Sequence, residues 1–217
     1  MLSKFFESKA WEWMGKVIDI IILGLYWCLC SIPIFTIGAS TTALYYSIHK
    51  VIFQGRGYTS EFFHSFKDNF KQATLSWLIF LLIYGVCGID IYITRQMLAN
   101  GDTFGSMWLL FVILMVLATV WAVYLFIYMA RFENGFKETF KISGALAVIH
   151  FGYSIAVLLI TAFFILFAYL MPVFILIIPE LYILCLHPIF EKMFRPYMSE
   201  EDQKLEEERL QLNNKDR

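Results

Sequence analysis

Residues 106–130 read SMWLLFVILMVLATVWAVYLFIYMA and contain no charged side chain. The hydrocarbon core of a bilayer is about 30 Å thick, and a helix that crosses it needs about 20 mostly apolar residues. Where lipid is the solvent, backbone groups must be satisfied within the segment, so a helix is the expected form of this run. The stretch therefore predicts a transmembrane helix, and its neighbours decide how many others accompany it.

The composition of the whole chain agrees with a membrane protein. Of the 217 residues, 59% are hydrophobic and 16% are charged, whereas charged residues make up about 25% of a typical soluble domain. These values exclude a disordered chain, a secreted disulfide scaffold and an ordinary cytosolic enzyme. The net charge of −1 provides no basic face for nucleic acid. The cysteines lie in apolar runs without ligand spacing, so no metal or cofactor is predicted.

Hydropathy divides residues 1–195 into six predicted spans of one all-α, polytopic domain. The apolar run 142–190 is too long for one span, and we divide it near Pro172 because helices tend to end before proline. Residues 38–53 are short and rich in small and hydroxyl side chains, so they could instead be re-entrant or interfacial, which would leave five spans. The expected spans are about 17–37, 38–53, 73–94, 106–130, 145–169 and 173–191.

The distribution of basic residues favours six spans. If residues 38–53 cross the bilayer, all of the 17 Lys and Arg residues except Arg95 lie on one side. Because cytoplasmic loops carry the excess of basic residues, this arrangement predicts a multi-pass cell-membrane protein with both termini in the cytoplasm. If residues 38–53 do not cross, the N-terminal lysines change sides and the bias weakens. Residues 196–217 are then a charged cytoplasmic tail.

Two similar motifs each precede a predicted span. Residues 66–71 read FKDNFK and residues 136–141 read FKETFK, so Phe and Lys each recur at i and i+4 and share a helical face. They predict short amphipathic helices at the cytoplasmic surface, with Phe among acyl chains and Lys toward headgroups or a partner. The alternative is a juxtamembrane anchor continuous with the next span. The candidate docking residues are Phe66, Lys67, Phe70, Lys71, Arg131, Glu133, Asn134, Phe136, Lys137, Phe140 and Lys141.

Ionisable residues at membrane depth are functional candidates because burying a charge in lipid is costly. Glu180 falls near the middle of the predicted span 173–191, and His187 lies seven residues later on nearly the same face. His150 is expected at a similar depth in the preceding span. A set of Glu180, His187 and His150 facing the bundle could bind a cation or relay protons, or each could be structural.

Several motifs resemble the YesL family of bacterial membrane proteins, a domain of unknown function. They are WMGK at residues 13–16, TIGA at 36–39 and the ARFENGFKET stretch at 130–139. The resemblance covers roughly residues 1–195, although the last two spans are similar only in hydropathy. It implies an accessory or regulatory role in carbohydrate uptake beside subunits of an ABC-type sugar importer, and it supplies no catalytic or ligand residues.

The residues contain no motif for a nucleophile, a phosphate loop or a metal set, so a non-enzymatic protein is expected. Besides the accessory role, a small channel or secondary transporter that uses Glu180 stays open. Six spans in a chain of this length enclose little volume, so that function would need a homo-oligomer. The lipid bilayer is the one partner that composition itself predicts.

Overall fold

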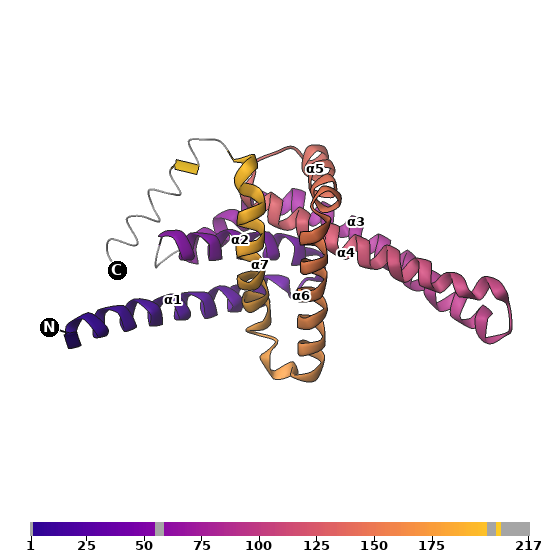
Figure 1. The fold of residues 1–217 in the computed structure, drawn as a ribbon, viewed down its shortest axis with the longest axis horizontal. Helices are drawn as coiled ribbons and strands as arrows, with labels where there is room; N and C mark the ends of the chain where they lie inside the picture. Colours follow the sequence, from indigo (N-terminus) through magenta and orange to yellow (C-terminus); the bar gives the residue numbers. More distant parts are fainter. Residues whose placement is uncertain (1, 55–58, 199–202, 205–217) are drawn as a thin grey trace.

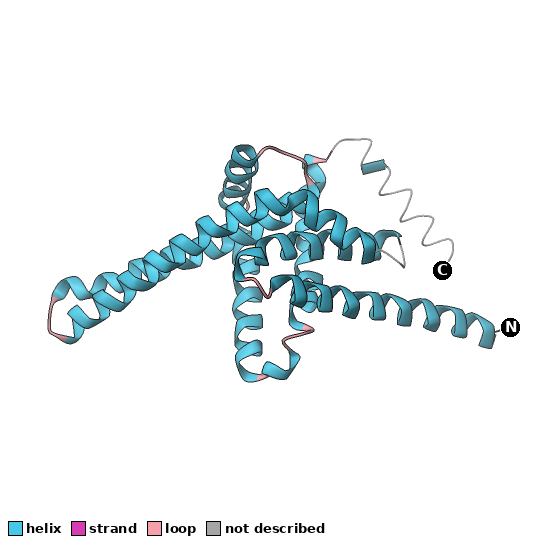
Figure 2. Ribbon diagram, turned by 180° about the vertical axis from the view of Figure 1, so that it is seen from behind, coloured by secondary structure: helices cyan, strands magenta, loops and turns pink. Residues whose placement is uncertain are grey.

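A computed structural model describes residues 2–54, 59–198 and 203–204, and within this part of the chain all regular structure is helical (Figures 1 and 2). The expectation of an all-α protein is confirmed. Most of the predicted tail, 196–217, lies outside the described residues. The α-helices are α1 (Leu2–Ser31), α2 (Ile37–Gln54), α3 (Thr59–Ala99), α4 (Trp108–Arg131), α5 (Phe136–Ile149), α6 (Phe151–Leu170) and α7 (Ile178–Phe194).

Helix α2 forms the centre of the bundle and contacts α1, α3, α4 and α7. Most of its described side chains are buried, including Leu44, Tyr45 and Ile48. Its hydroxyl groups donate to carbonyl oxygens one turn earlier, as Thr42 does to the oxygen of Gly38 at 3.0 Å. Small and hydroxyl residues let neighbouring helices approach closely. The modest hydropathy of residues 38–53 thus reflects a helix surrounded by protein.

Three described helical segments are long and apolar enough to cross a membrane: residues 60–99, 103–131 and 151–170. Residues 17–31 of α1 form a shorter apolar helix. Between 11% and 39% of the most apolar window of each long segment is buried within the protein. The exposed remainder is suited to lipid, and the number of six spans stays a prediction.

Two helical hairpins extend from the core, one formed by α3 and α4 and the other by α6 and α7. The α6–α7 hairpin runs transverse to the α3–α4 hairpin (Figure 1). The α3–α4 turn contains Gly101 at a φ of 87°, a conformation that favours glycine. The carboxylate of Asp102 then accepts a hydrogen bond from the Phe104 backbone N–H at 3.0 Å. The α6–α7 turn, residues 171–177, is exposed and contains no charged residue.

The helix bounds differ from the expected spans in several places. The first expected span, 17–37, is too long, because α1 ends at Ser31 and α2 begins at Ile37 after a 3-10 turn over Ile34–Thr36. The motif at 66–71 lies inside the 41-residue helix α3, continuous with the apolar segment that follows it. The motif at 136–141 begins a separate helix, α5, which ends at Ile149 before a non-helical His150. The apolar helix therefore starts at Phe151, and α7 starts at Ile178, after a short 3-10 turn that Pro172 opens.

Candidate functional site: a buried histidine, glutamate and arginine cluster

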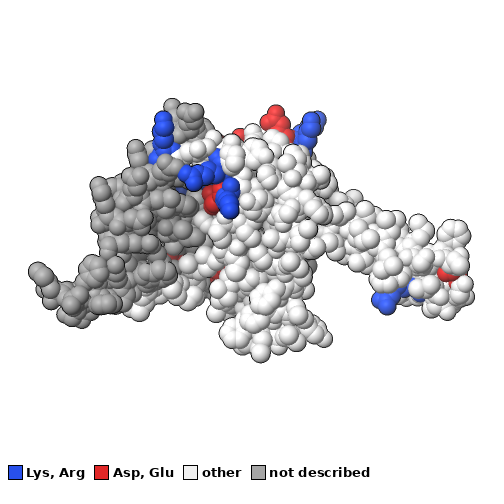
Figure 3. Space-filling view, viewed as in Figure 1, with Lys and Arg blue, Asp and Glu red and all other residues white. Residues whose placement is uncertain are grey.

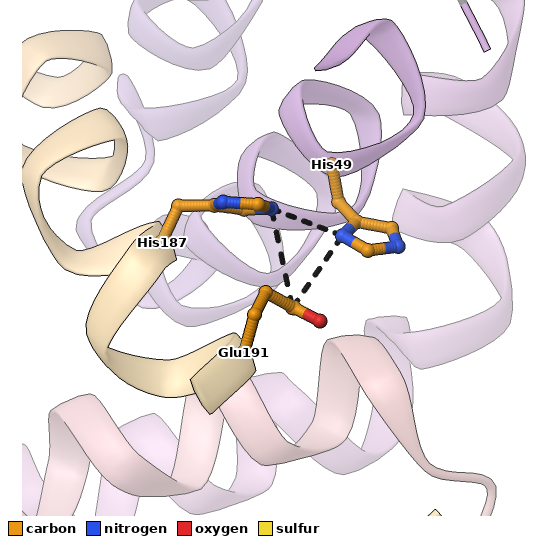
Figure 4. A group of neighbouring side chains, drawn as sticks. All are labelled: His49, His187 and Glu191. Carbon is orange, nitrogen blue, oxygen red and sulfur yellow. Dashed lines mark hydrogen bonds and ion pairs between the residues drawn. The ribbon is translucent and has the colours of Figure 1, made fainter. Parts of the chain in front are cut away.

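Four ionisable side chains from three helices meet in the core. His49 lies on α2, Arg131 is the last residue of α4, and His187 and Glu191 lie one turn apart on α7. His49 and His187 are only 8% and 7% exposed. Figure 4 shows both imidazoles and the Glu191 carboxylate pointing toward one another between α2 and α7. We call these four residues the polar cluster.

The distances within the polar cluster are those of hydrogen bonds and ion pairs. Nδ1 of His49 lies 3.0 Å from Nε2 of His187 and 3.4 Å from Oε1 of Glu191. Arg131 reaches two members: its Nη1 lies 2.8 Å from Nε2 of His49, and its Nη2 donates to Oε2 of Glu191 at 3.0 Å. Tyr45, one turn before His49, donates its hydroxyl to Oε1 of Glu191 at 2.8 Å.

These contacts fix the tautomer of His49. Arginine offers only N–H donors, so Nε2 of His49 must accept from Arg131. The imidazole proton is therefore on Nδ1, where both Nε2 of His187 and Oε1 of Glu191 are within reach as acceptors. The positive charge of Arg131 also balances the negative charge of Glu191, which a buried pair requires. The cluster thus joins α2, α4 and α7 through one charge-balanced network.

A cavity of about 440 Å³ lies next to the polar cluster and shares Arg131 with it. Its walls come from Tyr46 of α2, from the first part of α3, and from the end of α4 with residues 132–134 of the connection that follows. Gln72 of α3 donates to Oγ1 of Thr139 at 2.9 Å, and Asn134 donates to the Tyr128 hydroxyl at 2.7 Å, so this connection is held on both sides. The lining residues include Ser65, Asp68, Asn69, Gln72, Arg131, Glu133 and Asn134.

The predicted docking residues divide between this cavity and the protein core. Arg131, Glu133 and Asn134 line the cavity, and the four lysines of the repeated motif are exposed but are not among its lining residues. The phenylalanines face inward: Phe66 and Phe70 pack on the core, and Phe140 stacks on Phe80 at 5.7 Å. Phe136 lies 5.8 Å from Phe140. The motif therefore positions its lysines by anchoring its Phe side chains in protein.

The predicted set of Glu180, His187 and His150 is not brought together. His187 belongs to the polar cluster, whereas Nε2 of His150 lies 3.1 Å from the hydroxyl of Tyr197, in the 3-10 turn after α7. Glu180 lies in the first turn of α7 rather than mid-helix, is 1% exposed, and neither carboxyl oxygen has a hydrogen-bond partner among the described residues. It abuts Gly24 of α1, where an added Cβ would overlap its Oε1.

Sequence reasoning missed Tyr45, His49 and Glu191. One available signal was spacing, because Tyr45 and His49, like His187 and Glu191, are four residues apart and share a helical face. The pairing of α2 with α7 had no local signal, since His49 and His187 are 138 residues apart.

Comparison with known families gives one match. Residues 20–91 match a family model described as "Protein of unknown function, DUF624". The matched segment contains His49 and the 66–71 motif but neither Arg131 nor α7. No curated protein and no solved structure matches the chain. The chain is therefore similar, from the second half of α1 into α3, to a family whose function is unknown.

Proposed function

We propose that the protein is a non-enzymatic integral membrane protein that serves as an accessory or regulatory component for another membrane complex. The observation that carries this proposal is the cavity where α3 meets residues 131–134, since two separately predicted docking stretches converge there. Figure 3 shows charged side chains gathered at the end of the molecule near α5 and α7 and again at the tip of the α3–α4 hairpin, with an uncharged surface between them. Such a surface is suited to lipid, and the charged end to a soluble or headgroup-level partner.

The chemistry of the cavity suits a protein partner. Asp68 and Glu133 are exposed acids, and Lys67 and Lys71 are exposed bases of the neighbouring turns. Mixed charges of this kind give specificity and register to an interface more than raw affinity. The backbone behind them is fixed by the Gln72 and Asn134 hydrogen bonds, so the surface is preformed.

The resemblance to the YesL family directs the choice of partner. We propose subunits of an ABC-type sugar importer in the cell membrane, contacted from the cytoplasmic side where nearly all basic residues are expected. A photo-crosslinking residue placed at Glu133, in membranes of cells grown on glycans, should capture such a subunit. The same probe at Asp102, in the opposite turn, is the control and should not.

Charge reversal provides a second test of the same surface. Glu133→Lys should reduce recovery of the importer subunit in mild detergent, whereas Glu138→Lys, an exposed change outside the cavity, should leave it unchanged. Equal crosslinking at Glu133 and Asp102, or no importer subunit in either sample, would rule out this docking surface.

A second function rests on Glu180. A buried carboxyl without a hydrogen-bond partner among the described residues is costly in lipid unless it binds a proton or cation. We therefore keep an oligomeric transporter or channel as the alternative. Purified protein in liposomes should then conduct protons or cations, and Glu180→Gln should abolish the flux while Glu133→Gln does not. Unchanged flux in Glu180→Gln would remove this residue from any transport mechanism.

A further inference from the structure

We propose that His49, His187 and Glu191 form a binding site for a divalent transition-metal ion of the Zn²⁺ type. The hydrogen bond from Arg131 to His49 competes with binding of the ion. The inference rests on the geometry of the polar cluster and does not depend on the docking function. Neutral imidazole and carboxylate are ligands that Zn²⁺ accepts, and two His with one Glu is a set that leaves a further coordination position open.

The spacing of the three donor atoms fits one ion. Around a tetrahedral ion with bonds of about 2.0–2.1 Å, neighbouring ligand atoms lie about 3.3–3.4 Å apart. The separations here are 3.0 Å between the two imidazole nitrogens, 3.4 Å from Nδ1 of His49 to Oε1 of Glu191, and 4.0 Å from Nε2 of His187 to the same oxygen. Shifts of a few tenths of an ångström would place all three around a common centre.

The surroundings of the donors are also those of a metal site. His187 and Glu191 present their ligand atoms from one face of α7, and α2 supplies the third across the helix interface. The Tyr45 hydroxyl holds the ligating oxygen of Glu191 at 2.8 Å. Bonds of this kind orient metal ligands and contribute to affinity.

Arg131 makes metal binding conditional. An ion at Nδ1 of His49 requires the imidazole proton to move to Nε2, where it would face the Nη1 donor of Arg131. Two donors cannot share that contact, so the ion must displace the Arg131–His49 bond while Nη2 keeps Glu191. The number of protons is unchanged, because the shift exchanges one tautomer of His49 for the other. Removing Arg131 should therefore strengthen binding, the reverse of what a purely structural role predicts.

The test is a titration of the purified full-length chain in detergent, prepared without a polyhistidine tag, with Zn²⁺ against a chromophoric chelator. We expect one equivalent to bind, and His49→Gln or His187→Gln to weaken affinity at least about 100-fold. Arg131→Gln should bind about 10- to 100-fold more tightly than wild type. His64→Gln removes an exposed histidine paired with Asp68 and should change nothing.

A spectroscopic readout protects the test against variants that fail to fold. Co²⁺ bound to the wild type should give the intense visible bands of a four- or five-coordinate site, and Zn²⁺ should abolish them. Absence of stoichiometric binding to the wild type would overturn the proposal. Equal binding by wild type and the His187→Gln variant, or weaker binding by a folded Arg131→Gln variant, would overturn it as well.

Discussion

Gly24 is a residue whose smallness the structure uses directly, because the Glu180 carboxyl occupies the space of its missing side chain. Gly24→Ala should displace the buried Glu180 carboxyl from its place against α1, and overpacking of this kind costs about 1–3 kcal/mol. The measurement is the thermal unfolding midpoint in detergent. Gly88→Ala, with nothing near its added Cβ, is the matched control and should not lower the midpoint. A Gly24→Ala midpoint equal to the control would contradict this packing.

The Arg131–Glu191 pair should show strong coupling, since the two side chains are 14% and 13% exposed. Removal of one partner leaves a buried charge, so Arg131→Gln or Glu191→Gln should each lower stability by roughly 3–5 kcal/mol. The double variant should lose much less than the sum, as a double-mutant cycle in chelator-treated protein would show. Additive losses would mean that the two charges do not interact.

At the scale of the element, the α3–α4 turn depends on one backbone conformation. Gly101 has a φ of 87°, so Gly101→Ala should strain the turn by about 1 kcal/mol. Hydrogen exchange of residues 98–108 should become faster, while α6 keeps its protection. Gly135→Ala, at a negative φ of −64° with open space around it, is the control and should leave exchange unchanged. Unaltered exchange in the Gly101→Ala turn would contradict the expected strain.

The same scale shows which elements the sequence predicts. Residues 108–130 of the apolar run 106–130 lie in α4, because an uninterrupted apolar run has few alternatives to a helix. The end of α6 at Leu170 agrees with the expected stop before Pro172. The fifth predicted span is divided at His150, and no proline near this position predicts the break. It follows from α5 packing its own buried face, Thr139, Ser143 and Leu146, so only tertiary contacts specify it.

For the whole molecule, the basic-residue pattern predicts that the two charged ends lie on opposite sides of the membrane. Single cysteines at Asp102 and Glu133, both exposed, should test this in a chain whose four native cysteines are replaced. Asp102→Cys should react with an impermeant reagent in intact cells, and Glu133→Cys only after permeabilisation. Reaction of both on one side would refute the predicted orientation.

The candidate site depends on a pairing of α2 with α7 that composition and local spacing do not specify. Glu180 and His187 stand out in the sequence because charge in an apolar run is rare, whereas His49 sits in an ordinary-looking stretch beside Lys50. His49 joins the cluster because α2 packs against α7, and this helix contact depends on the packing of the whole bundle. The sequence therefore predicted His187 as an intramembrane candidate and Arg131 as a docking candidate. It did not predict that the two residues lie in one cluster.

The separation of His49 from His187 by 138 residues has a consequence for how the chain is made. During synthesis, α2 leaves the ribosome long before α7, so Arg131 and His49 cannot contact Glu191 until α7 has been made. Closure of the network is therefore a late step of folding, which a chain lacking α7 cannot complete.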